Sequence, residues 1–95
     1  MTQLRKIIQS PLFARQKKKL HKPQAKDLDN AVKTVFENPS IGDPKVGDLQ
    51  GVRVYKFKSR GRQILMSYEV AESVLYLYTV GSHENFYREL KRYLK

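Results

Sequence analysis

Residues 51–82 read GVRVYKFKSRGRQILMSYEVAESVLYLYTVGS, and this stretch holds three runs with strand character. The runs GVRVYKFK, QILMSYEV and VLYLYTVG are rich in β-branched and aromatic residues, which favour strands. The segments SRGR and AES that separate them are short enough for antiparallel hairpins. The stretch therefore predicts a three-stranded antiparallel meander.

The residues before this stretch predict one short strand and two helices. Residues 4–9, LRKIIQ, can form the strand. Ser10 followed by Pro11 is the pattern of a helix N-cap with proline at the first helical position. A Lys-Pro pair ends that short helix, and apolar residues at helical spacing predict a second helix over residues 22–38. Residues 40–51, SIGDPKVGDLQG, are rich in Gly, Asp and Pro, which predicts a linking loop.

The C-terminal segment predicts a helix with one buried stripe. From Glu84 onward, apolar side chains recur at i, i+4, i+7 and i+8, at Phe86, Leu90, Tyr93 and Leu94. The predicted fold is therefore α+β, in the order β-α-α-β-β-β-α, with an antiparallel sheet, an N-terminal helical hairpin and a C-terminal helix. The chain has 95 residues and no internal repeat or linker, so residues 1–95 are expected to form a single domain.

The composition argues against a metal centre and against a membrane protein. The chain has no cysteine, and two isolated histidines do not make a convincing zinc site. No apolar stretch approaches the roughly 20 residues that a membrane-spanning helix needs. The N-terminus, MTQLRKIIQS, lacks the apolar core of a signal peptide. We therefore expect no metal, no cofactor and no membrane partner, and a cytoplasmic location.

Positive charge is the strongest feature of the composition. Nineteen Lys and Arg against nine Asp and Glu give a formal net charge of +10. No acidic residue precedes Asp27, whereas eight Lys and Arg do, and the acid-free residues 51–62 hold five more. Such a run can simply be a solvated face, and for residues 17–19 alone that explanation has equal weight. Both runs in so small a domain favour a nucleic-acid partner.

Alternation along the strand predicts which face of the sheet each residue of the basic run occupies. If Tyr55 and Phe57 face the core, Lys56 and Lys58 stand on the open face of the sheet with converging ammonium groups. Solvent-facing lysines are ordinary in an alternating strand, so the pair alone is a weak signal. In the next run, the same alternation places Leu65 on this open face. An exposed leucine there suggests a partner surface, although single exposed apolar residues are common.

His83 is predicted to lie where the last strand meets the last helix. Ser82 fits an N-cap, so the free N–H groups of the helix would favour a phosphate nearby and disfavour protonation of the imidazole. Metal-free RNA cleavage needs a base for the 2′-hydroxyl, positive charge for the phosphorane and an acid for the 5′-oxygen, and histidine and lysines can supply all three. Tyr87, four residues on, could stack on a base. A structural histidine and a half-buried tyrosine are the alternatives that the spacing leaves open.

The segments LQGVRVYKFK, ILMSYEV and VLYLYTVGSHENFY resemble the RelE/ParE superfamily of toxins from bacterial type II toxin-antitoxin operons. The resemblance covers nearly the whole chain and is most specific in GxxVYKxK and in the VGSHxxxY ending, which is similar to the RelE and YafQ branches. It implies a small RelE-like fold. It also implies a toxin that enters the ribosomal A site, cuts messenger RNA and is held inactive by a cognate antitoxin.

The resemblance carries functional roles to particular positions. Lys56 and Lys58 match the paired lysines that RelE-like toxins use for transition-state charge. His83 matches a catalytic histidine of the YafQ branch, where the RelE branch has an arginine. Tyr87 matches the aromatic residue that follows in the terminal motif. Leu65 departs from the pattern, because RelE-type enzymes carry an arginine at that position.

The combined prediction is a ribosome-dependent, metal-independent endoribonuclease that forms a hetero-oligomer with its antitoxin. The antitoxin is expected to cover the basic face of the sheet, including the neighbourhood of Leu65. Two alternatives stay open: a ParE-type protein that poisons DNA gyrase, and an inactive relic or adaptor that only binds ribosomal RNA. The predicted catalytic residues are His83, Lys56, Lys58 and Tyr87, and the predicted substrate-binding residues are Arg53, Arg60, Arg62 and Arg88.

Overall fold

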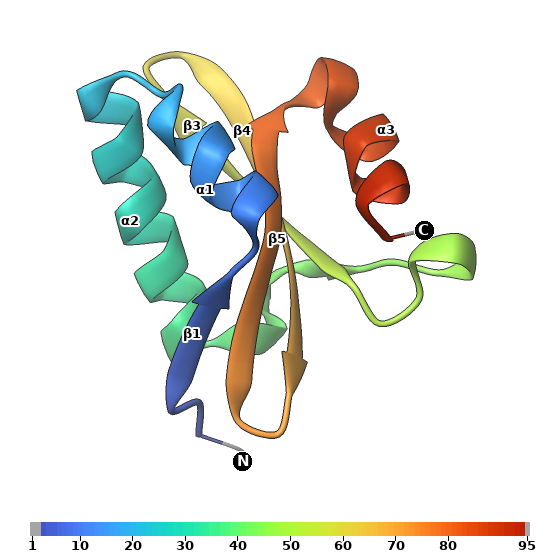
Figure 1. Ribbon diagram of the computed structural model, residues 1–95. Helices are drawn as coiled ribbons and strands as arrows, with labels where there is room; N and C mark the ends of the chain where they lie inside the picture. The colour runs from blue at the N-terminus through green and yellow to red at the C-terminus, as the bar shows by residue number, and fades with distance from the viewer. Residues whose placement is uncertain (1–2, 95) are drawn as a thin grey trace.

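The computed structural model describes residues 3–94, apart from the side chains of residues 83–85. It confirms the predicted order of the main elements (Figure 1). Five strands and three helices follow one another as β1 (Lys6–Gln9), α1 (Pro11–Lys18), α2 (Lys22–Glu37), β2 (Asp43–Pro44), β3 (Arg53–Ser59), β4 (Arg62–Ala71), β5 (Val74–Ser82) and α3 (His83–Leu94). Two short 3₁₀ helices, η1 (Pro39–Ile41) and η2 (Gly47–Leu49), lie between α2 and β3.

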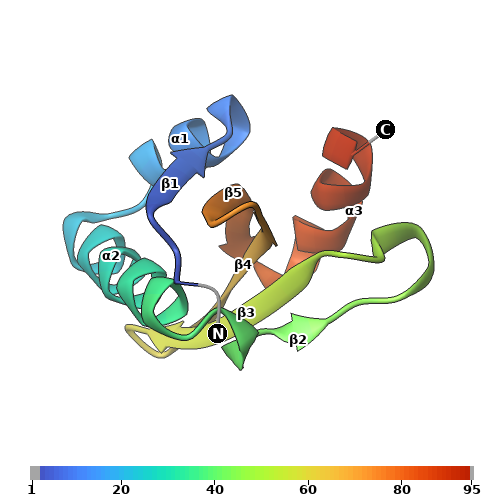
Figure 2. The ribbon, with the colours of Figure 1, turned by 90° about the horizontal axis from the view of Figure 1, so that it is seen from below.

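The strands form one sheet in the order β1-β5-β4-β3-β2. Strands β3, β4 and β5 are the predicted antiparallel meander, and β1 lies parallel to β5 at the opposite edge from β2. Helices α1 and α2 cover one face of the sheet, and α3 lies over the other (Figures 1 and 2). None of the helices in residues 3–94 is long and apolar enough to cross a membrane.

The segment predicted as a linking loop is partly ordered by the sheet. Its residues Asp43 and Pro44 pair with Val54 and Arg53 and so form β2, which the sequence prediction missed. Tyr68 fixes the preceding turn, because its hydroxyl donates to the carbonyl of Pro39 at 2.6 Å and accepts the N–H of Gly42 at 2.9 Å. The prediction of a plain linker was therefore wrong for this part of the chain.

Both hairpins of the meander have two-residue turns with positive φ. Arg60 and Gly61 have φ of 54° and 80°, and Glu72 and Ser73 have φ of 51° and 68°. Positive φ at both central positions matches the right-handed twist of the flanking strands. Neither Glu72 nor Ser73 is a residue type that adopts this conformation without cost.

The first hydrophobic cluster lies between the sheet and the helices α1 and α2. It contains Ile64, Met66 and Tyr68 from β4, and Phe13 and Leu28 from the helices. The helical hairpin therefore packs against the sheet through its apolar stripes. Val70, Tyr55 and Phe57 are partly buried against the same cluster.

A second cluster lies on the other face of the sheet, beneath α3. It contains Leu65 from β4, Val54 from β3, and Phe86 and Leu90 from α3. The side chain of Leu65 is 0% exposed, so the prediction of an exposed leucine was wrong. Alternation assigned its face correctly, but α3 turns back and covers that face. Of the predicted helical stripe, Phe86 and Leu90 are buried, whereas Tyr93 and Leu94 remain 38% exposed.

Candidate active site

The register of the sheet brings the end of β5 level with the two lysines of β3. Lys56 pairs with Leu65, and Leu65 pairs with Gly81. In the next row, Phe57 and Ser82 flank Ile64 on its two sides. Helix α3 therefore begins at the level of Lys56 and Lys58. The backbones of β3 and β5 are about 10 Å apart there, since neighbouring strands are spaced by about 4.8 Å.

A bulge in β5 sets which residues near its end face α3. Ser67 pairs with Thr79 and Tyr68 pairs with Leu77, so Tyr78 has no partner on β4. Because of this extra residue, the side chains of β5 before and after the bulge alternate between the two faces of the sheet in opposite phase. Thr79 then shares the α3 face with Ser67, and their buried hydroxyl oxygens are 2.5 Å apart in a hydrogen bond.

Lys56 and Lys58 are both exposed, as predicted, while Val54 before them on the same face is buried beneath α3. The two lysines therefore emerge where the second cluster ends. Among the side chains that the structure describes, no carboxylate forms an ion pair with either lysine. At this rim the two lysines place positive charge on the exposed surface of β3.

His83 is the first residue of α3, directly after β5. This position confirms the predicted junction of strand and helix. The side chain of His83 lies outside the described residues, so its catalytic role remains a prediction that rests on the position of its backbone.

Tyr87 faces the segment around η2. Its ring meets the ring of Phe86 edge-on at 5.2 Å between centroids, and the ammonium of Lys45 lies 5.4 Å from the centroid of the Tyr87 ring. A hollow of about 600 Å³ beside it is lined by Asp48, Tyr87, Arg88, Lys91 and Arg92. Tyr87 is thus half-buried at the edge of this hollow, which three cations of α3 and one carboxylate also line.

Lys45 was missed by the sequence analysis. It lies in the segment that composition marked only as a loop, and a lysine there carries no periodic signal. Its contact with Tyr87 joins residues 42 positions apart in the chain and follows from the packing of α3.

The predicted substrate-binding arginines do not form one group. The guanidinium of Arg53 donates to the carbonyls of Gly42 at 2.7 Å and Ser40 at 3.2 Å, on the face opposite Lys56. Arg60 lies exposed in the β3–β4 turn, and Arg62 is exposed at the start of β4.

Arg62 belongs by alternation to the α2 face. It pairs with Ser59, whose hydroxyl donates to Asp27 of α2 at 2.6 Å. Of the four arginines predicted to bind substrate, Arg88 is the one that lies on α3, next to Tyr87.

Tyr78 is a structural neighbour of the site. Its hydroxyl donates to Glu69 at 2.9 Å, and its ring lies 5.6 Å from that of Tyr93. Burial and the hydrogen bond to Glu69 raise the pKa of Tyr78. Tyr78 therefore stays protonated at neutral pH and is no candidate for the general base.

Residues 7–91 match the model of a family described as the ParE-like toxin of the type II bacterial toxin-antitoxin system. The chain belongs to this toxin family. It is thus a toxin of a type II toxin-antitoxin system and a member of the RelE/ParE superfamily, as the sequence resemblance implied. No curated protein sequence matches the toxin.

Solved structures show that the toxin has the RelE-like fold. A mutant of E. coli RelE in the free state is 19% identical with a TM-score of 0.74, and the match covers 99% of the toxin and 95% of RelE. A chain of the E. coli RelBE toxin-antitoxin complex is 21% identical with a TM-score of 0.68, covering 82% and 95%. E. coli YafQ is 16% identical with a TM-score of 0.59, covering 81% and 91%.

Proposed function

We propose that this toxin is a metal-independent endoribonuclease that cuts messenger RNA in the ribosomal A site. The observation that carries the proposal is the sheet register, because it sets two exposed lysines of β3 level with the start of α3. The N-terminal end of a helix favours a phosphate, and the lysines add positive charge on the same face.

Each step of the cleavage has a candidate group. His83 takes the proton from the 2′-hydroxyl or gives one to the leaving 5′-oxygen. Lys56 and Lys58 stabilise the negative charge that develops on the phosphorane. Tyr87 and Arg88 position the base and the RNA backbone from α3. The products would be a 2′,3′-cyclic phosphate, or its opened form, and a 5′-hydroxyl.

Leu65 separates this proposed mechanism from that of the RelE branch. The resemblance places an arginine there in RelE-type enzymes, whereas here the position is filled by a fully buried leucine. The missing charge must then come from other cations of the same face. On the α3 side the candidates are Lys45, which contacts the Tyr87 ring, and Arg88, which lines the same hollow as Tyr87. Arg60 is a candidate from the turn.

A cognate antitoxin is the proposed protein partner. The net charge of +10 favours an acidic segment over the face that holds Lys56 and Lys58. The expected antitoxin contact around Leu65 needs correction, because the side chain of Leu65 is already covered by α3. The exposed lysines, rather than an apolar patch at Leu65, would be the centre of that interface.

A gyrase poison is the second candidate function. The matching family is described as ParE-like, and Leu65 supplies no catalytic charge. A protein of this kind would act as a ligand of DNA gyrase and would cut no RNA.

Inducing the toxin in bacteria and mapping the 5′ ends of translated transcripts tests both candidates. The ribonuclease proposal expects new ends within reading frames, lost when translation is blocked and lost in His83→Ala. Lys56→Ala combined with Lys58→Ala should lose the new ends as well, and its charge-matched control is Lys26→Ala with Lys33→Ala, two exposed positions of α2 on the far side of the sheet. Growth arrest with intact transcripts and broken chromosomes would favour the gyrase poison instead.

A further inference from the structure

Helix α1 completes the edge of β5 beyond the point where β1 ends. Strand β1 pairs with β5 only as far as Leu77. The next groups on that edge are satisfied from α1 and its N-cap: the N–H of Ser10 donates to the carbonyl of Leu77 at 2.9 Å, and its hydroxyl donates to the carbonyl of Tyr78 at 2.6 Å. The N–H of Val80 then donates to the side-chain oxygen of Gln16 at 2.9 Å.

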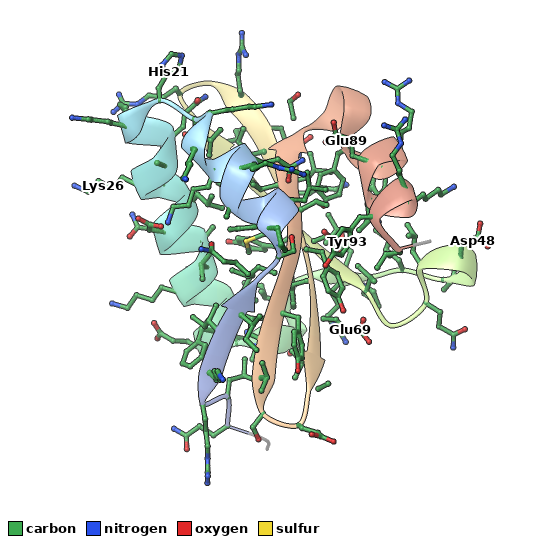
Figure 3. All side chains as sticks on the ribbon, viewed as in Figure 1. His21, Lys26, Asp48, Glu69, Glu89 and Tyr93 are labelled. Atoms are coloured by element: carbon green, nitrogen blue, oxygen red, sulfur yellow. The ribbon has the colours of Figure 1, made fainter. Side chains whose placement is uncertain are left out.

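The other end of the same amide reaches α3. Nε2 of Gln16 donates to Oε2 of Glu89 at 2.7 Å. An amide side chain offers both an acceptor and donors, so a single group can join a backbone N–H to a carboxylate. Gln16 therefore connects three elements: α1, which carries it, the end of β5, and α3. Figure 3 shows Glu89 on α3, and this residue lines a groove with Arg15 and Leu12 of α1.

The two contacts of Gln16 bracket the junction that carries the candidate catalytic residues. Val80 lies three residues before His83, and Glu89 lies two residues after Tyr87. Glu89 contacts α1, whereas Tyr87 contacts Lys45 in the segment before η2. Helix α3 is therefore held from both flanks at the level of the site.

The main anchors of these elements lie elsewhere. Helix α1 is fixed by Phe13, which is 1% exposed, and α3 is fixed by Phe86 and Leu90, which are 2% and 0% exposed. Apolar contacts of this kind supply most of the packing energy, and the hydrophobic effect behind them is non-directional. The two directional hydrogen bonds of Gln16 then fix the orientation of α3 relative to β5.

We propose that Gln16 is a positioning residue for RNA cleavage, which acts by fixing the β5–α3 junction through Val80 and Glu89. The inference rests on the proposed function, and it adds a residue of the N-terminal helix that touches no substrate. Gln16 sets the position of His83 and Tyr87 relative to Lys56 and Lys58. Small displacements of catalytic groups cost large factors in rate, which makes such a role measurable.

The chain offers a swap that isolates this role. In Gln16→Glu, the new carboxylate still accepts the N–H of Val80 but cannot donate to Glu89, and two carboxylates then face each other. Adding Glu89→Gln restores a donor at position 89 and returns the net charge to its original value. Gln24→Glu on α2, the helix on the opposite face of the sheet from α3, makes the same charge change and serves as the control.

The assay is single-turnover cleavage of messenger RNA on purified ribosomes, with the melting temperature of each variant measured alongside. We expect Gln16→Glu to slow the cleavage step about 10-fold or more, with the ribosome concentration at half-maximal rate little changed. The swapped pair should return to within about threefold of wild type, and Gln24→Glu should match wild type.

Glu89→Ala covers the case in which Gln16→Glu fails to fold, since it removes the α3 contact and leaves the bond to Val80 in place. It should slow cleavage at an unchanged melting temperature. If the Gln16→Glu toxin and the Glu89→Ala toxin both cleave messenger RNA as fast as the wild-type toxin, the positioning role of Gln16 is overturned while the proposed function stands. A wild-type toxin that leaves the message intact would overturn the proposed function and the positioning role together.

Discussion

Replacing Leu65 with alanine tests whether α3 seals the second hydrophobic cluster. The leucine side chain is fully buried between the sheet and α3, where it packs with Val54, Phe86 and Leu90. Strands on one side and a helix on the other leave little room for collapse, so the lost methyl groups leave a cavity. Leu→Ala at such sites costs about 2–5 kcal/mol, and we expect about 3 kcal/mol here.

That loss corresponds to a fall in melting temperature of about 12–24 °C for a domain of this size. Thermal unfolding followed by circular dichroism measures it. Leu94→Ala is the matched control, because Leu94 lies on the same helix and is 38% exposed, so its loss should cost below about 0.5 kcal/mol. Equal shifts for the two variants would show that Leu65 is not sealed beneath α3.

Three further predictions concern stability. Glu72→Asn with Ser73→Gly relieves positive φ in the β4–β5 turn and should stabilise the fold by about 1 kcal/mol, seen as a rise in melting temperature; no rise would contradict the turn conformation. Gly42→Ala places a Cβ 2.5 Å from the hydroxyl of Tyr68 and should lower the free energy of unfolding by about 1–3 kcal/mol in a urea titration, whereas an unchanged midpoint would refute that close approach. The raised pKa of Tyr78 means that its contribution to stability is complete below about pH 10, the unfolded value, and is lost as the pH rises above it. The free energy of unfolding should therefore fall more steeply above pH 10 in wild type than in Tyr78→Phe, and parallel curves would speak against the shift.

The meander and the outward direction of Lys56 and Lys58 could be predicted because they are local properties. Alternation along β3 depends only on the strand period, and the lengths of SRGR and AES select tight hairpins. The N-cap was equally local, since the hydroxyl of Ser10 accepts the N–H of Phe13 at 2.9 Å, three residues on.

The features that escaped prediction depend on contacts between distant parts of the chain. Alternation told which face Leu65 occupies but not that α3 returns over that face. Gln16 contacts residues 64 and 73 positions away, and no pattern around it marks it out. Lys45 sits in a Gly- and Pro-rich segment whose position is set by Tyr68 through a hydroxyl bonded to Pro39 and Gly42.

The measurement that tests the central claim most directly is the chemistry of the new RNA ends. Messenger RNA cut on ribosomes by purified toxin is treated with a polynucleotide kinase, with or without prior phosphatase. Cleavage through the 2′-hydroxyl by histidine and lysine predicts 5′-hydroxyl ends that are labelled without phosphatase, and much less product with Lys56→Ala and Lys58→Ala combined. Ends that carry a 5′-phosphate, or undiminished cleavage without the two lysines, would contradict the account.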